Sequence, residues 1–133
     1  MSSFMRPLAL LSLLLSAALF GFFYAWVCST MWGLDTADPR VAIKAMQAMN
    51  TSVRNAVFFP AFFLTPVALG LTAYVLRAHR QSAALFTASA LVYFAFGLLL
   101  TMLVNVPMNE ALALVSVPEE IEAAEAIWSE YSS

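Results

Sequence analysis

The sequence is poor in charge and has almost no cysteine or histidine. Charged residues make up 11% of its 133 residues, and the formal net charge is −2. Such a balance gives no basic surface, so we expect no nucleic-acid partner. The single cysteine, Cys28, excludes an intramolecular disulfide and a cysteine-rich zinc site. The single histidine, His79, excludes a multi-histidine metal or haem site within one chain, and we expect no metal and no other cofactor.

Hydrophobic residues, in contrast, make up 62% of the sequence. This fraction is well above that of soluble proteins, which need more polar surface to cover themselves. We therefore predict that the lipid bilayer surrounds the chain and that residues 1–133 form a single membrane domain. The predicted fold class is all-α, a transmembrane helix bundle, and the predicted location is the bacterial inner membrane.

Three runs without formal charge are long enough to cross a bilayer, and we place the spans at about 7–32, 55–76 and 82–104. The first run is too long for the apolar part of a signal peptide, which favours a retained span. Short amphipathic helices are predicted at about 39–53 and 118–131. The first begins with Asp38-Pro39, an N-cap followed by proline at the first helical position. The second carries an apolar stripe that includes Trp128 and Tyr131.

The remaining charges differ between the two sides of the predicted bundle. Arg6 and the turn Arg77–Arg80 lie on one side, and the acidic C-terminal tail lies on the other. The positive-inside rule places the N-terminus and the basic turn in the cytoplasm. The loop 35–55 and the motif Asn105–Asn109 then both lie on the outer face, although they are far apart in the sequence.

These two polar motifs form the predicted site. Asn50 and Arg54 are four residues apart and share a helix face, and so do Asn105 and Asn109. Carboxamides and a guanidinium suit an enolate or a quinone-like carbonyl, which a flat oxygenated aromatic ligand would supply. The predicted catalytic residues are Arg54, Asn105 and Asn109, and the predicted substrate-binding residues are Asn50, Asn55, Glu110, Phe59 and Phe62.

Each motif also has a purely structural interpretation. Asn105 can cap a helix that starts at Pro107, and Arg54 can extend to the lipid headgroups. Glu110 and Asp35 remain as candidates for a general base, because Asp38 is explained as an N-cap. The sequence leaves the structural and the functional interpretation open.

Three stretches resemble the anthrone-oxygenase-like family of small integral membrane proteins. They are Gly21-Phe-Phe-Tyr-Ala, then Met46-Gln-Ala-Met-Asn50 with Val53-Arg-Asn55, and Asn105-Val-Pro-Met-Asn109-Glu. The resemblance implies a four-helix membrane fold. For a few fungal members it also implies cofactor-independent oxidation of anthrones to anthraquinones by O₂.

The sequence departs from this family at its end. The family continues past a Trp-x-x-Tyr element, here Trp128-Ser-Glu-Tyr131, into a histidine-containing segment and a fourth span, whereas only Ser132 and Ser133 follow here. We therefore expect three spans, with the fourth either truncated or supplied by a membrane protein partner or a second copy. Two functions stay open: an anthrone-type oxygenase, or a non-catalytic membrane subunit that packs against a partner protein or lipid.

Overall fold

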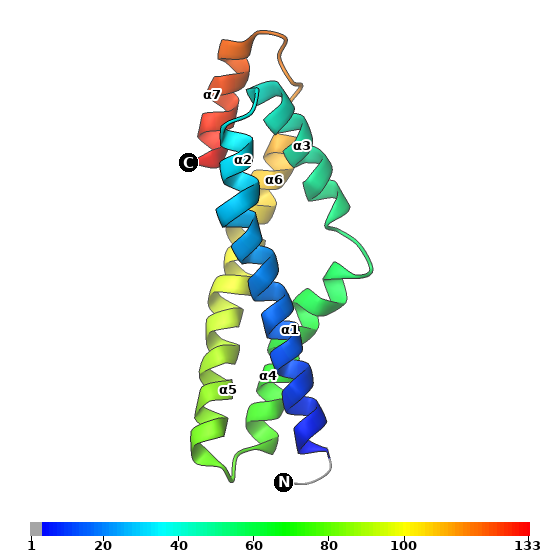
Figure 1. The fold of residues 1–133 in the computed structure, drawn as a ribbon, viewed down its shortest axis with the longest axis vertical. Helices are drawn as coiled ribbons and strands as arrows, with labels where there is room; N and C mark the ends of the chain where they lie inside the picture. The colour runs from blue at the N-terminus through cyan, green and yellow to red at the C-terminus, as the bar shows by residue number, and fades with distance from the viewer. Residues whose placement is uncertain (1–3) are drawn as a thin grey trace. The chain divides into compact units, whose positions relative to one another are not determined.

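The computed structural model describes residues 4–133, which are helical and contain no strand. The all-α prediction is therefore confirmed. The α-helices are α1 (Met5–Ala25), α2 (Trp32–Asp35), α3 (Pro39–Ser52), α4 (Phe58–Val75), α5 (Arg80–Val92), α6 (Val106–Ala113) and α7 (Ile121–Ser132), shown in Figure 1. The π-helical segments are η1 (Trp26–Met31), η2 (Tyr93–Leu99) and η3 (Thr101–Asn105).

Three helical stretches of the described chain are long and apolar enough to cross a membrane: Met5–Asp35, Phe58–Val75 and Arg80–Ala113. The prediction of three apolar helices long enough to span a membrane is confirmed, and the chain is an integral membrane protein. The first and third stretches have 31 and 34 residues, whereas a span needs only ~20. Both helices continue past the apolar runs, the first to Asp35 and the third through Glu110.

The chain divides into two compact units. Unit 1 comprises Met1–Gly21 and Ala56–Met102, and unit 2 comprises Phe22–Asn55 and Leu103–Ser133. Each unit is thus built from two segments that are distant in the sequence. The first and third candidate spans contribute residues to both units.

Unit 1 is held together by packing of α4 on α5 and by a polar contact to α1. The hydroxyls of Ser12 and Thr72 lie 2.8 Å apart, and both side chains are buried. Ser12 Oγ also donates to the backbone oxygen of Leu8 at 3.0 Å. In a lipid bilayer the hydrophobic effect does not drive helices together, so hydrogen bonds between hydroxyl side chains contribute to helix association.

Proline inside α4 creates a second polar contact in unit 1. Pro66 has no N–H, so the carbonyl of Phe62, four residues earlier, loses its helical partner. The hydroxyl of Tyr93, in η2, donates to this oxygen at 2.9 Å. The carbonyl that proline leaves free is thereby satisfied by a neighbouring helix, as a membrane span requires.

Unit 2 is built around α3, which lies against α2, α6 and α7 (Figure 1). Asp38 caps α3 as predicted, because its side chain accepts from the backbone N–H of Arg40 at 2.9 Å. The Arg40 side chain also pairs with this carboxylate, and together these hydrogen bonds lower the pKa of Asp38 to about 2. The buried core residues of the unit are Ala42, Ile43, Met46, Leu112, Ala124 and Trp128.

Candidate functional site

One face of α3 carries the polar side chains of Arg40 and Gln47, which are seven residues apart, about two helical turns, and so point in nearly the same direction. Arg54 follows at the same spacing but lies just beyond the end of α3 at Ser52, so it does not share a helix face with Asn50 as the sequence predicted. Each of them reaches the segment that contains α6 and the start of α7. At one end of this row, Arg54 Nη2 lies 3.5 Å from Glu110 Oε1, and both side chains are largely exposed.

The middle and the other end of the row bind backbone oxygens. Gln47 Nε2 donates to the carbonyls of Leu112 at 2.8 Å and Val115 at 3.0 Å, where α6 ends. The last carbonyls of a helix have no partner within the helix, so the amide acts as their cap. Arg40 Nη1 donates to the Glu119 carbonyl at 3.0 Å, just before α7. The polar face of α3 therefore fixes the course of the chain from α6 to α7.

The two asparagine motifs meet through Tyr131. Its hydroxyl donates a hydrogen bond to Asn109 Oδ1 at 2.6 Å. The same hydroxyl accepts a hydrogen bond from Asn50 Nδ2 at 3.4 Å. Asn50 is buried, with 7% of its surface exposed, and the other two side chains are partly buried. Burial raises the pKa of Tyr131 above its ordinary value, so its phenol stays protonated and can donate.

Asp35 has a structural partner. Its Oδ1 accepts from the indole N–H of Trp128 at 2.9 Å, and Trp128 is buried in the core of unit 2. A buried indole needs an acceptor for its single N–H. The contact ties α7 to the end of α2, which explains Asp35 without a role as general base.

Four of the predicted site residues come together in unit 2. Asn50 and Asn109 share the Tyr131 hydroxyl, and Arg54 faces Glu110, the residue that follows Asn109. Asn55 is exposed at the end of α3, where its Nδ2 donates to the Ser52 carbonyl at 2.7 Å.

Asn105 does not cap a helix, so the structural interpretation offered from the sequence is wrong. Its backbone is helical, with φ −66° and ψ −41°, and its side chain makes no capping hydrogen bond. The helix runs from η3 through Asn105 into α6, with Pro107 near the start of α6. Pro107 has no N–H, so it removes one backbone hydrogen bond at this junction. The Asn105 side chain is exposed.

The two predicted aromatic residues belong to unit 1. Phe62 is buried and stacks on Phe58, with ring centroids 5.4 Å apart. Phe59 is 44% exposed and packs edge-on against Phe63. A ligand contact for Phe59 or Phe62 stays a prediction.

A family model decides the identity of the chain. The model described as anthrone oxygenase matches residues 49–132. The chain belongs to the anthrone oxygenase family. The matched region contains Asn50, Arg54, Asn109, Glu110 and Tyr131, which together form what we call the polar network. Comparisons with curated proteins and with solved structures gave no match.

Tyr131 is the site residue that sequence reasoning missed in this member of the anthrone oxygenase family. Its spacing with Trp128 predicts only an apolar stripe along the last helix. Both residues do face the interior of unit 2, but each brings a polar atom that needs a partner there. A tyrosine on the buried face of an amphipathic helix, opposite two asparagines, is the signal that could have pointed to the network.

The polar network offers carboxamides, a phenol and one Arg–Glu pair as its chemical groups. Among residues 4–133 there is no group of three or more His, Cys, Asp or Glu side chains that could hold a metal ion. Carboxamides and a neutral phenol both donate hydrogen bonds, and Arg54 adds a positive charge. Such donors suit a ligand oxygen that is negatively charged or becomes so.

Proposed function

We propose that the polar network of unit 2 binds the oxygen of a flat oxygenated aromatic molecule and that the protein oxidises an anthrone-type substrate. The observation that carries this proposal is the Tyr131 hydroxyl, 2.6 Å from Asn109 Oδ1 and in reach of Asn50. This hydroxyl joins both polar motifs inside the region that matches the anthrone oxygenase family.

The proposed reaction begins with loss of a proton from the methylene carbon opposite the anthrone carbonyl. The electron pair of that C–H bond moves to the carbonyl oxygen, which becomes an enolate. The enolate reduces O₂, and a carbon–oxygen bond forms at the former methylene carbon. Loss of the second hydrogen with one oxygen atom, as water, leaves a second carbonyl. One O₂ therefore yields one anthraquinone and one water, and the substrate supplies all the electrons.

The polar network would stabilise the enolate. In this proposal the single O–H of Tyr131, which donates to Asn109 Oδ1 in the free protein, turns to the enolate oxygen when substrate binds, and its raised pKa keeps the donor proton in place. Asn109 and Asn105 supply further carboxamide donors, and the charge of Arg54 opposes the developing anion. Glu110, 3.5 Å from Arg54, is the candidate base for the methylene proton.

The remaining predicted residues have supporting roles. Asn50 donates to the Tyr131 hydroxyl, and Asn55 follows Arg54 in the connection just after α3. A contact of Phe59 or Phe62 with the rings of the substrate stays a prediction from the sequence.

The test uses the purified protein in lipid vesicles with anthrone and O₂. Anthraquinone formation and O₂ uptake are followed together, and vesicles without protein give the spontaneous rate. Arg54→Ala and Asn109→Ala should each lower the catalysed rate by ~10²–10³, the usual cost of a lost donor to a developing oxyanion. Arg6→Ala, which removes a charge in unit 1, should keep the rate. Full activity in both unit 2 variants would overturn the assignment.

The rival function is a non-catalytic membrane subunit. Its support is apolar surface beside the polar network: Leu114 is 88% exposed and Ile121 is 52% exposed, at either end of the connection from α6 to α7. This function predicts no anthrone turnover above that of empty vesicles. It also predicts that the protein purifies with a partner in mild detergent, so a lone monomer by mass measurement would contradict it.

A further inference from the structure

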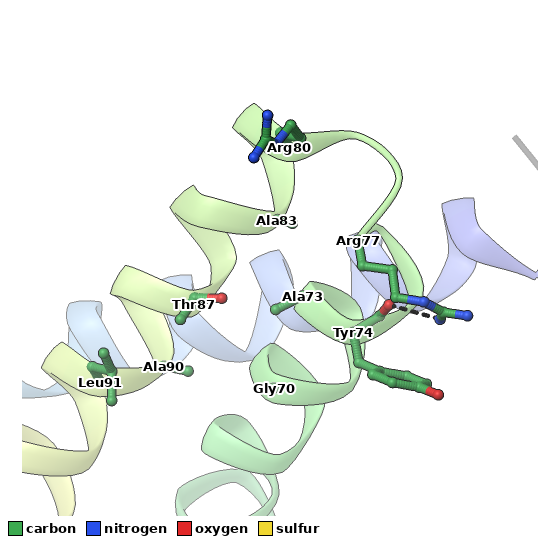
Figure 2. A pocket seen from close by; sticks show the side chains of 9 residues that line it. All are labelled: Gly70, Ala73, Tyr74, Arg77, Arg80, Ala83, Thr87, Ala90 and Leu91. Carbon is green, nitrogen blue, oxygen red and sulfur yellow. Dashed lines mark hydrogen bonds between the residues drawn. The ribbon is translucent and has the colours of Figure 1, made fainter.

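Unit 1 contains a groove of about 520 Å³ between α4 and α5. Figure 2 shows the residues that line it. Most of its walls come from small side chains that leave space between the two helices. The lining residues are Gly70, Ala73, Tyr74, Arg77, Arg80, Ala83, Thr87, Ala90 and Leu91.

The groove has a basic end. Arg77 and Arg80 lie where the turn joins α4 to α5 (Figure 2). Arg77 is already engaged, since its guanidinium stacks on the Tyr74 ring at 4.5 Å and donates to the Tyr74 carbonyl at 3.2 Å. The side chain of Arg80 is exposed and makes no hydrogen bond or ion pair with any residue from 4 to 133. One guanidinium at this end is therefore available for an external anion.

A hydroxyl lies further along the groove. Thr87 extends from α5 (Figure 2), and its hydroxyl has no hydrogen-bond partner in the described part of the chain. Threonines in membrane helices commonly donate to the carbonyl four residues earlier, as Thr65 does to Ala61 at 2.6 Å. Thr87 does not, so its donor is available to a ligand within the apolar span.

The length of the groove matches one leaflet of a bilayer. Arg80 and Leu91 are eleven residues apart on one helical stretch, which corresponds to about 16 Å along its axis. Half of the hydrocarbon core is about 15 Å thick. The groove thus combines a free cation at the membrane edge, a hydroxyl part-way along, and small apolar walls over the depth of one leaflet.

We propose that this groove binds one anionic phospholipid. Its phosphate lies on Arg80, an ester oxygen accepts from Thr87, and an acyl chain lies against the small residues Gly70 and Ala90. Basic pockets between spans favour anionic over zwitterionic headgroups by charge complementarity. This inference concerns unit 1 and is independent of the oxygenase activity proposed for unit 2.

Lipid retention tests the proposal. The purified protein in mild detergent is incubated with phosphatidylglycerol or with phosphatidylcholine, and the retained lipids are counted by native mass spectrometry. Phosphatidylglycerol should be retained preferentially. Arg80→Gln should lower its retention by about fivefold, the effect of one basic residue near a lipid surface. Arg6→Gln makes the same charge change outside the groove and should leave retention unchanged.

A second pair of variants tests the groove without altering charge. Ala83→Leu fills the space between α4 and α5 and should reduce retention of phosphatidylglycerol, whereas Ala84→Leu, at a neighbouring position that does not line the groove, should not. Circular dichroism and size-exclusion chromatography verify that each variant is folded. Equal retention of both lipids would overturn the proposal, and so would equal effects of Arg80→Gln and Arg6→Gln. The proposal would also be overturned if native mass spectrometry showed a second copy of the chain bound in the groove instead of a lipid.

Discussion

Tyr131 connects two motifs that are separated by more than fifty residues in the sequence. Topology alone could place Asn50 and Asn109 on the same side of the membrane, because two spans lie between them. It could not show that Tyr131 joins them, since this contact depends on how α7 folds back against α3. The hydrogen bonds to Asn109 and Asn50 make Tyr131 the residue on which the site most depends.

Substitution of Tyr131 should change how stability depends on alkaline pH. Burial raises the pKa of Tyr131 above 10.0 in the folded protein. The unfolded phenol therefore ionises first as pH rises. The stabilising contribution is complete below pH 10 and is lost as pH rises towards the folded pKa. Tyr131→Phe should flatten the fall in thermal unfolding midpoint above pH 10. If the unfolding midpoints of the unaltered protein and of Tyr131→Phe fall in parallel above pH 10, the expected contribution of Tyr131 is absent.

The start of α3 is the element that the sequence predicted best. Asp38-Pro39 is a local signal, and the structure confirms it because capping needs only neighbouring residues. The partners of α3 are long-range and could not be read from the sequence. Gln47, for example, binds carbonyls at the end of α6, more than sixty residues away. The start of α6 lies next to Pro107 as expected, but the Asn105 side chain does not cap it, because η3 leads directly into α6.

The cap of α3 should make the protein sensitive to acid. Hydrogen bonds from Arg40 lower the pKa of Asp38 from 3.8 to about 2. Its stabilising contribution is therefore present above pH 3.8 and is lost as pH falls through about 2. Asp38→Asn keeps a capping oxygen but cannot titrate, so its unfolding midpoint should change less over this window. Glu130→Gln, which alters an exposed carboxylate of α7, is the control. If the unfolding midpoint of Asp38→Asn falls with decreasing pH as steeply as that of the unaltered protein, the expectation is contradicted.

The contact from η2 to α4 should depend on Pro66. Tyr93→Phe removes the donor to the Phe62 carbonyl and should lower the free energy of unfolding by about 1 kcal/mol. In a Pro66→Ala background the restored backbone N–H can bond this carbonyl, so Tyr93→Phe should cost less there. Thermal unfolding of the single and double variants in detergent measures the coupling. Strictly additive effects would mean that the Tyr93 hydroxyl does not compensate for the proline.

At the scale of the whole molecule, the apolar runs predicted the three spans well. Absence of charge over about twenty residues is a strong signal because charge in lipid is costly. The ends of the long helices were not predictable, since the helix of the third span continues through Glu110 after the apolar run has ended. The division into two units also has no local signal, because each unit combines segments from both halves of the chain.

The orientation of the spans is a prediction of its own. Arg77–Arg80 should face the cytoplasm, and the connection from α6 to α7 should face outwards. In a Cys28→Ser background, a membrane-impermeant thiol reagent applied to intact cells lacking an outer membrane should label Ser116→Cys and not Ala78→Cys. Labelling of both after the membrane is opened is the control. The reverse pattern in intact cells would invert the topology and place the polar network in the cytoplasm.

The most direct measurement is the initial rate of anthraquinone formation by the unaltered protein, Tyr131→Phe and Tyr74→Phe in the same vesicles. Both substitutions remove one hydroxyl, but only Tyr131 bridges Asn50 and Asn109. If the polar network binds the enolate, Tyr131→Phe should lower the rate by at least ~10², and Tyr74→Phe should leave it unchanged. Equal rates for the two variants would contradict a site in unit 2.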